Sequence, residues 1–450
     1  MSIIPSYARR ENLNAVAEEK PGFIRELGAQ ERLFHYYSAE HPRHFCVVAE
    51  LAANKDPEDY RAAFAMIQRR HPILSVSVRD DSRHGAGFYR TNRPLKLTFI
   101  PFAEEADWRR VVERELATAF PDSDGPLMRV TILHDDGLHD VEFHGAGRAT
   151  VVLTLHHGAA DALSGAYIIQ DLMEALNGRP LPPLPVMPPL ETIAARRLLN
   201  ADAIAPAPHA EKDAAALRAI ADAPLWRPFE GDRPIVSTLA FDRTFTARAL
   251  HCARENGTTL HGTICAALIC STAADVGKDT FTITSAVDLR AMLDVDQRNC
   301  ALLVGAGTVR FPLRDRRLTG SAFWKLARQA TADLAPARTP EGVVRGLGAL
   351  EAKLPPATAD SKLASGTMGS LQYDAIVSNL GALPIPTTVG SVRLEAFWGP
   401  SVQGRFTNER VIGAASLDGQ LRIVQTTPSH IPSFLDDLQR ILVEACADDE

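Results

Sequence analysis

The sequence predicts an α/β protein, of the α+β two-layer kind, built from two domains. Its 450 residues exceed the roughly 250 to 300 that a single hydrophobic core usually supports. Strand-like runs alternate with amphipathic helical stripes in both halves of the chain. Between the halves, residues 179–189 (RPLPPLPVMPP) contain six prolines, a density that favours an extended connector. We therefore expect an N-terminal domain at 1–178, a Pro-rich then helical crossing at 179–225 and a C-terminal domain at 226–450.

Each element of the first half follows from a local signal. Residues 44–51 are a β-rich run, and Pro57 marks the first turn of a helix whose apolar stripe ends at His71. A second clear helix begins after Asp161 and ends at Asn177-Gly178. The other expected strands and the remaining helix of this half lie at 73–78, 95–100, 126–133 and 150–157, and at 106–119.

The second half restarts after an alanine-rich stretch, residues 191–221, that is typical of a helix. One helix should end at Asn256-Gly257, another should run from Thr258 or Thr259 to Ala273, and a closing helix is expected at about 432–445. The expected strands lie in FTITSAVDLR and at 236–241, 302–311, 375–378, 392–398, 411–417 and 421–425.

Composition excludes several classes of function. A formal net charge of -7 gives no overall attraction to nucleic acid. No run of about 20 residues is free of charge and polarity, and the N-terminus lacks the apolar stretch of a signal peptide. Six scattered cysteines without a CxxC pair predict reduced thiols, no disulfide framework and no zinc site. We expect a cytoplasmic protein without a membrane span.

The segment LHHGAAD, residues 155–161, joins the most strand-like stretch of the first half to a helix. Adjacent residues of a strand project to opposite faces, so His157 shares an apolar face with Leu155 and Leu153, whereas His156 lies with Thr154. The two rings therefore cannot readily bind one metal ion together. A neutral imidazole of lowered pKa at the end of an apolar strand can act as a base near neutral pH.

Each of these residues also has a plain structural explanation. A histidine at a strand end is often only a hydrogen-bonded core or rim residue. Asp161 stands directly before a helix, where aspartate is a favoured N-cap that contributes typically about 1 kcal/mol. His134, His139 and His144 are explained by a Gly- and Asp-rich turn as well as by a metal site.

The sequence HHGAADA resembles the HHxxxDG signature of the superfamily that unites condensation domains with chloramphenicol acetyltransferase-like acyltransferases. Four other segments resemble that superfamily in the right order. SNLG is closest to polyketide-associated acyltransferases of the phthiocerol dimycocerosyl transferase type. The four segments are LGAQERLF at 27–34, RRHPIL at 69–74, GPLMRV at 125–130 and SNLG at 378–381.

The resemblance implies two chloramphenicol acetyltransferase-like domains that form a V-shaped pseudo-dimer with a tunnel at their interface. It implies that His157 is the general base and that His156 supports the turn. Asp161 would be structural, paired with an arginine of the second domain, for which Arg290 in VDLR is the candidate.

Four further positions are candidates for the tunnel wall on the same basis: Gly158, Ala162, Ser378 and Asn379. Ala162 replaces the final glycine of the signature, and its methyl group should alter the shape of the substrate site. Ser378 and Asn379 suit a turn equally well, because asparagine and glycine are favoured there for backbone reasons.

The function that the resemblance implies is transfer of an acyl group from a carrier-protein or CoA thioester to an alcohol or amine. Such an enzyme would act in polyketide, lipid or nonribosomal peptide biosynthesis as a monomer, and would need no cofactor beyond its thioester substrate. One alternative is a catalytically silent module that binds a carrier protein. Another is a metal-dependent hydrolase using His156, His157 and Asp161, which the opposed ring directions disfavour. Arginines that could dock an acidic carrier are Arg69, Arg70, Arg109, Arg110, Arg196 and Arg197.

Overall fold

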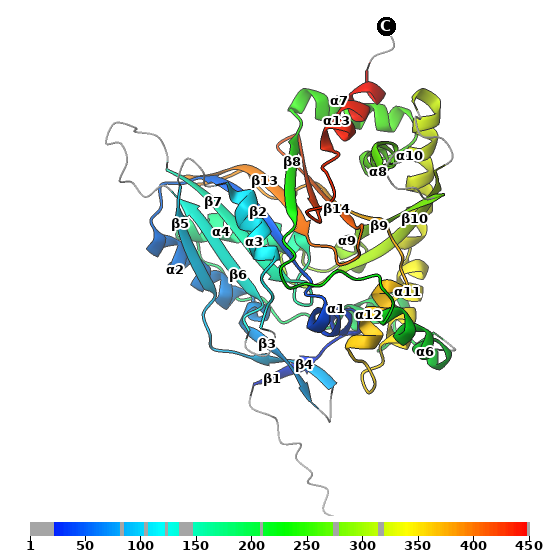
Figure 1. Ribbon diagram of the computed structural model, residues 1–450. Helices are drawn as coiled ribbons and strands as arrows, with labels where there is room; N and C mark the ends of the chain where they lie inside the picture. Colours follow the sequence, from blue (N-terminus) through cyan, green and yellow to red (C-terminus); the bar gives the residue numbers. More distant parts are fainter. Residues whose placement is uncertain are drawn as a thin grey trace, which may run out of the picture.

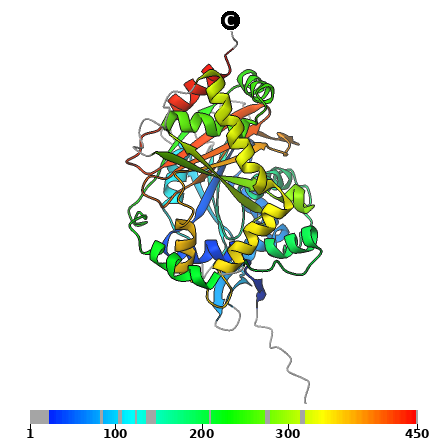
Figure 2. The same ribbon diagram turned by 90° about the vertical axis from the view of Figure 1, so that its right-hand side faces the viewer.

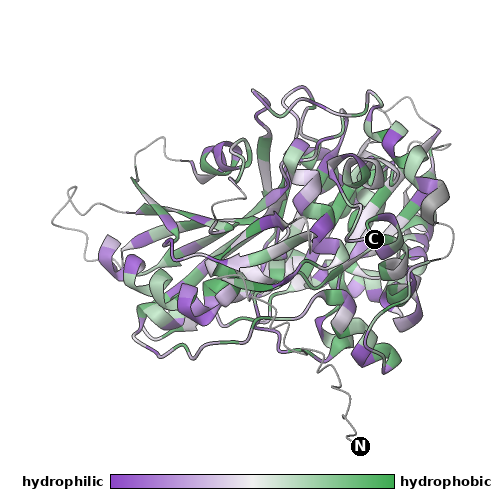
Figure 3. Cartoon of the chain, turned by 90° about the horizontal axis from the view of Figure 1, so that it is seen from below, coloured by the Kyte–Doolittle hydropathy of each residue, from purple (hydrophilic) through white to green (hydrophobic). Residues whose placement is uncertain are grey.

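The computed structural model describes residues 22–81, 85–102, 107–121, 125–134, 147–207, 210–272, 279–313 and 319–447. These residues form two six-stranded sheets and one three-stranded sheet, with helices packed against them (Figure 1). Figure 3 shows the hydrophobic residues concentrated on the strands and on the helix sides that cover them.

The sheet of the N-terminal half has the strand order β12-β13-β2-β7-β6-β5. Alternate residues of its central strands face two layers. Val47 and Leu153 pack with helices α2 and α4, whereas Val48 and Val152 pack with α3. The bounds are β2 His44–Ala52, β5 Lys96–Pro101, β6 Met128–His134, β7 Arg148–His156, β12 Thr388–Val389, β13 Val392–Val402, α2 Pro57–Arg70, α3 Trp108–Leu116 and α4 Ala162–Leu176.

The sheet of the C-terminal half has the order β10-β9-β11-β14-β15-β8. Its core helix α8 is buried on nearly all sides, which explains why its sequence shows no polar stripe. The bounds are β8 Ile235–Ala240, β9 Thr280–Asp288, β10 Val304–Pro312, β11 Ala375–Ala382, β14 Arg410–Leu417, β15 Gln420–Thr427, α7 Arg243–Glu255, α8 Leu260–Thr272, α10 Gly320–Leu334 and α13 Leu435–Ala445.

The remaining elements lie around the junction of the two halves. Helices α1 and α12 pack together, and α12 also packs on α6, as Figure 1 shows at the lower right. In Figure 2 the yellow helices of residues 320–353 run down one side of the molecule. The bounds are β1 Phe23–Glu26, β3 Val76–Asp81, β4 Gly85–Arg90, α1 Ala29–Glu40, α5 Leu190–Ala194, α6 Ala210–Ala221, α9 Arg290–Leu293, α11 Pro340–Lys353 and α12 Ser361–Gly369, with short turns η1 Pro72–Ser75, η2 Ala195–Leu199 and η3 Ala335–Arg338.

Strand β13 connects the two halves. It comes from the C-terminal half of the sequence, yet it pairs antiparallel with β2 in the N-terminal sheet, from Arg393 opposite Ala52 to Val402 opposite Phe45. The expected division at 179–225 therefore separates the two large sheets except for residues 388–402, which join the N-terminal one.

The crossing of β13 over β14 requires a glycine. A Cβ atom on Gly413 would lie 2.0 Å from the carbonyl oxygen of Pro400, far inside van der Waals contact. We expect Gly413→Ala to lower the free energy of unfolding by about 1 to 3 kcal/mol, because the strands must move apart. In the matched control Gly346→Ala on α11, the new Cβ has no neighbour within 4 Å, so stability should be unchanged or slightly raised. Urea unfolding of both variants tests this, and equal effects would contradict it.

Several expected elements are confirmed, with small shifts of their ends. Helices α2 and α4 begin after Asp56 and Asp161, which cap them, and residues 179–189 have no regular secondary structure. Two expectations were wrong in detail. The strand expected at 73–78 begins only at Val76, because Pro72–Ser75 form a 3₁₀ turn. The alanine-rich stretch is two helices with a break between them.

Candidate active site

His157 directly follows strand β7 and lies between two aromatic rings. Its backbone N–H donates to the carbonyl oxygen of Arg43 at 3.2 Å. Its ring stacks on Phe34, with centroids 4.3 Å apart and planes 3° from parallel, and meets Phe45 edge to face at 5.2 Å. These contacts on both sides fix the plane of the imidazole.

His157 forms part of the wall of a cavity of about 360 Å³. The lining comes from α1, β2 and α4 of the N-terminal half and from β9, β10, β11 and β13 of the C-terminal half. The volume lies within the range of small-molecule sites. Part of the wall is apolar, and its members include Phe34, Phe45, Ile376, Leu380, Pro400 and Val402.

The His157 ring is neutral at pH 7. Burial, and after it the positive charge of Arg43, lowers its pKa to about 4. The opposing influences, a contact of the ring with its own backbone carbonyl and the charge of Asp161, are smaller. The ring therefore has a lone pair available to accept a proton.

His156 points to the other side of the sheet, as the strand alternation predicted. Its Nδ1 accepts a hydrogen bond from the backbone N–H of Gly158 at 3.1 Å, and its ring meets Phe120 edge to face at 5.9 Å. These contacts hold the turn that follows β7. Gly158 itself is buried in this turn and is not among the residues that line the cavity.

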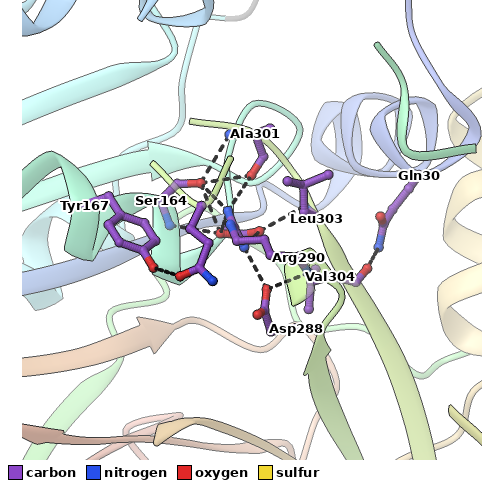
Figure 4. Close-up of polar contacts among 10 residues, drawn as sticks. Gln30, Ser164, Tyr167, Asp288, Arg290, Ala301, Leu303 and Val304 are labelled. Atoms are coloured by element: carbon purple, nitrogen blue, oxygen red, sulfur yellow. Dashed lines mark hydrogen bonds and ion pairs between the residues drawn. The ribbon is translucent and has the colours of Figure 1, made fainter. Parts of the chain in front are cut away.

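Asp161 and Arg290 join the two halves, which confirms the expected pair. Figure 4 labels Arg290 beside its other partners, Asp288 and Ser164. The guanidinium donates to both carboxylate oxygens of Asp161, at 2.9 and 2.8 Å. Asp161 also accepts from the backbone N–H groups of Ser164, as helix cap, and of Leu303, both at 2.9 Å. Burial alone would raise the pKa of Asp161, but Arg290 and these donors hold it below its usual value.

The other tunnel candidates do line the cavity. Ala162 is the first residue of α4 and lines the cavity. Ser378 and Asn379 lie on β11. The side-chain oxygen of Asn379 accepts from the backbone N–H of Gly381 at 2.9 Å, so the turn explanation also holds for this residue.

Sequence reasoning missed six polar residues of the cavity wall: Gln30, Arg43, Tyr167, Thr284, Asp288 and Gln297. The Tyr167 hydroxyl donates to Gln297 at 2.8 Å, and the Gln30 amide nitrogen donates to the carbonyl oxygen of Val304 at 2.7 Å. Gln30 lies inside LGAQERLF and Asp288 inside VDLR, two segments that the sequence analysis singled out for other residues.

Among the described residues no three His, Cys, Asp or Glu side chains are grouped as metal ligands. His139 and His144 lie outside the described residues. No helix in the described part of the chain is both long and apolar enough to cross a membrane.

Of the arginines considered for carrier docking, Arg70 is excluded. It is buried, and its Nε atom donates to Asp171 at 2.9 Å, so it holds α2 against α4 instead of facing a partner.

Four histidines should make stability fall as the pH falls. Burial is the main cause that lowers the pKa of His44 to about 3 and the pKa values of His41, His157 and His261 to about 4. Between the folded value and the unfolded value of about 6.5, the unfolded chain binds more protons. The stabilising contribution is therefore complete above about pH 6.5 and is lost progressively toward pH 4.

We expect the free energy of unfolding to drop by on the order of 1 to 2 kcal/mol per buried histidine between about pH 7 and pH 5. Urea unfolding at several pH values measures this slope. His261→Gln should flatten the slope, whereas His251→Gln, on the surface, should leave it unchanged. An unchanged slope in the His261 variant would contradict the prediction.

Residues 230–434 match the family described as the phthiocerol/phthiodiolone dimycocerosyl transferase C-terminus. No curated protein matches the chain in sequence.

Solved structures of the same fold span nearly the whole chain. Polyketide synthase associated protein 5 from Mycobacterium tuberculosis is 18% identical with a TM-score of 0.61, covering 96% of this chain and 100% of its own. A trichothecene 15-O-acetyltransferase from Fusarium sporotrichioides is 13% identical with a TM-score of 0.66, covering 94% of both chains. The first condensation domain of the CDA synthetase is 14% identical with a TM-score of 0.66, covering 94% of this chain and 97% of its own. The chain thus has the chloramphenicol acetyltransferase-like fold that the sequence predicted.

Proposed function

We propose that this chain is a member of the superfamily of condensation domains and chloramphenicol acetyltransferase-like acyltransferases, and that it transfers an acyl group from a thioester to an alcohol or amine. The donor would be a carrier-protein or CoA thioester. The match of residues 230–434 and the fold support an acyl-transferring enzyme of polyketide or peptide biosynthesis. The observation that carries the finer proposal is the neutral His157 ring held at the wall of a cavity between the two halves.

In the proposed step, a ring nitrogen of His157 accepts the proton of the acceptor's O–H or N–H as its oxygen or nitrogen attacks the thioester carbonyl carbon. The tetrahedral intermediate then collapses with cleavage of the C–S bond. The imidazolium returns the proton to the departing thiolate, so the histidine ends as it began. A positioned base of this kind contributes typically about 10²- to 10⁴-fold.

The lowered pKa of His157 favours the second proton transfer, to the leaving thiolate, over the first, from the acceptor. A ring with a pKa of about 4 is a weak base, but its protonated form is a strong acid. It is therefore well suited to deliver a proton to the leaving thiolate. The weak basicity of the ring disfavours proton abstraction. The growing negative charge on the intermediate offsets this, because it stabilises the imidazolium.

Ser378 and Asn379 support a second part of the proposal. Both line the cavity on β11, in the sheet that faces His157 from the C-terminal half. The Ser378 hydroxyl is a candidate donor to the oxyanion of the intermediate, a position where one hydrogen bond commonly contributes a large share of catalysis.

Intact-mass measurement of acylated carrier proteins and of acyl-CoA consumption tests the proposed function. Each donor is incubated with this protein and with a pool of alcohols or of amines. The expected result is loss of acyl mass from one donor together with a new ester or amide that requires the acceptor. Donors that remain acylated with every acceptor, or that only hydrolyse, would overturn the proposal and would favour a silent carrier-binding module.

A further inference from the structure

One region of the cavity wall has oxygen atoms without donors. The carboxylate of Asp288, at the end of β9, uses Oδ1 to accept from the guanidinium of Arg290 at 2.9 Å. Its second oxygen, Oδ2, has no hydrogen-bond partner among the described residues. The side chain is 39% exposed, and it lines the cavity.

Gln30 supplies a second oxygen of the cavity wall that has no donor. Its amide nitrogen donates to the carbonyl oxygen of Val304, and Val304 lies directly opposite Asp288 in the β9–β10 ladder (Figure 4). That hydrogen bond fixes the amide group. The Oε1 atom of Gln30 is buried, lacks a partner within the described structure, and belongs to a residue that lines the same cavity. Buried acceptors without donors are uncommon in proteins, so Gln30 Oε1 indicates a ligand that donates hydrogen bonds, and Asp288 Oδ2 is a partly exposed acceptor of the same cavity wall.

The charges of the wall indicate which kind of donor. Arg43, which also lines the cavity, lies 3.6 Å from the carboxylate of Glu409. Arg290 is the only cation in contact with two described carboxylates of the wall, because it binds both Asp161 and Asp288. Asp161 is buried, and its two carboxylate oxygens accept a bidentate pair of hydrogen bonds from the guanidinium of Arg290. The Asp288 end of the cavity therefore carries one negative charge in excess.

We propose that Asp288 forms a subsite that binds a protonated amine of the substrate, separate from the group that is acylated. A protonated amine has no lone pair with which to attack, so the reacting group must lie elsewhere in the molecule, toward His157. The ammonium donates to Asp288 Oδ2 and neutralises the excess charge, and Gln30 Oε1 remains an acceptor for another donor group of the same molecule. The inference rests on the proposed function only in naming the bound molecule as the acyl acceptor.

Binding of two simple probes tests the subsite without requiring turnover. Aminooctanol and octanediol have similar length and apolar surface, but only the first is a cation. Ligand-observed NMR titration should give about fivefold tighter binding of aminooctanol, the effect of one partly exposed ion pair. The preference should decrease with added salt. Equal affinities for the two probes would overturn the proposal.

Asp288→Asn is the decisive variant, because the amide keeps an oxygen acceptor and loses the charge. It should bind both probes equally, with octanediol little affected. Asp296→Asn is the matched control: it removes a nearby carboxylate that does not line the cavity, and it should keep the preference. A preference that survives in Asp288→Asn would refute the assignment.

Measurement of the unfolding midpoint distinguishes a purely structural role of Asp288 from a role in binding the amine. Loss of its contact with Arg290 would lower the unfolding midpoint and weaken both probes together, without changing their ratio. If the asparagine variant does not fold, Asp288→Ser retains a small polar partner for Arg290 and is tested in the same way. Failure of acyl transfer with every donor would refute the proposed function but would leave this ratio of affinities measurable.

Discussion

Arg290→Leu is expected to lower the free energy of unfolding by about 3 to 5 kcal/mol, the usual cost of leaving a buried charge without its partner. Asp161 is only 4% exposed and would keep a carboxylate that the leucine cannot pair. The loss should be larger at pH 7 than at low pH, because the pKa of Asp161 is held below its usual value by Arg290 and protonation removes the unpaired charge. Denaturant unfolding at both pH values measures this difference.

Two comparison variants make the Arg290 prediction specific. Arg243→Leu breaks an ion pair with Asp418 on the surface, where both side chains are more than half exposed, and should change stability little. Asp161→Asn has a single oxygen that can keep the helix cap but not the hydrogen bond from Leu303; because Arg290 retains its pair with Asp288, this variant should still cost less than Arg290→Leu. If Arg290→Leu and Arg243→Leu have similar effects, the buried pair does not stabilise the junction.

His157→Ala is expected to reduce kcat for acyl transfer by about 10²- to 10⁴-fold while the protein stays folded. The ring makes contacts with Phe34 and Phe45 but no ion pair, so its removal leaves a small cavity and no unpaired charge. Circular dichroism and urea unfolding verify the fold, and His430→Ala on the surface is the control. A folded His157→Ala protein with full activity would show that the ring is not the base.

The pH dependence of kcat/KM provides an independent check on His157. Because its pKa is lowered to about 4, the neutral form predominates throughout the range from about pH 6 to pH 8. The rate should therefore be level with pH there for an alcohol acceptor. A decline with an apparent pKa near 6.5 would indicate an ordinary, solvated histidine.

The elements that the sequence predicted are those with local signals. Asp56 and Asp161 mark helix starts through hydrogen bonds that span only two or three residues. Helices α1, α10, α11 and α12 were not predicted, because their burial comes from contacts with distant elements. The alternation of β13 was visible in the sequence, but its partner β2 lies more than three hundred residues earlier, so its sheet was not.

The residues of the site likewise include some that local motifs predicted and some that they did not. His157, Asp161 and Arg290 belong to motifs that a single sequence displays, and the structure confirms the Asp161–Arg290 contact. No sequence motif marks Gln30 or Asp288 as a residue of the cavity wall. They line the same cavity only because α1 contacts β10 at Val304, which pairs with Asp288 of β9. Cavity walls built from several segments are long-range products of packing, which local patterns do not encode.

The insertion of β13 beside β2 also has a consequence for how the protein is made on the ribosome. The first sheet cannot receive its penultimate strand until residues 392–402 have been synthesised, long after β2 and β7 have left the exit tunnel. At typical elongation rates of about 5 to 20 residues per second, the free edge of β2 is exposed for tens of seconds. The nascent chain must keep that edge from pairing with other molecules over this time, which makes early aggregation the main hazard of its biogenesis.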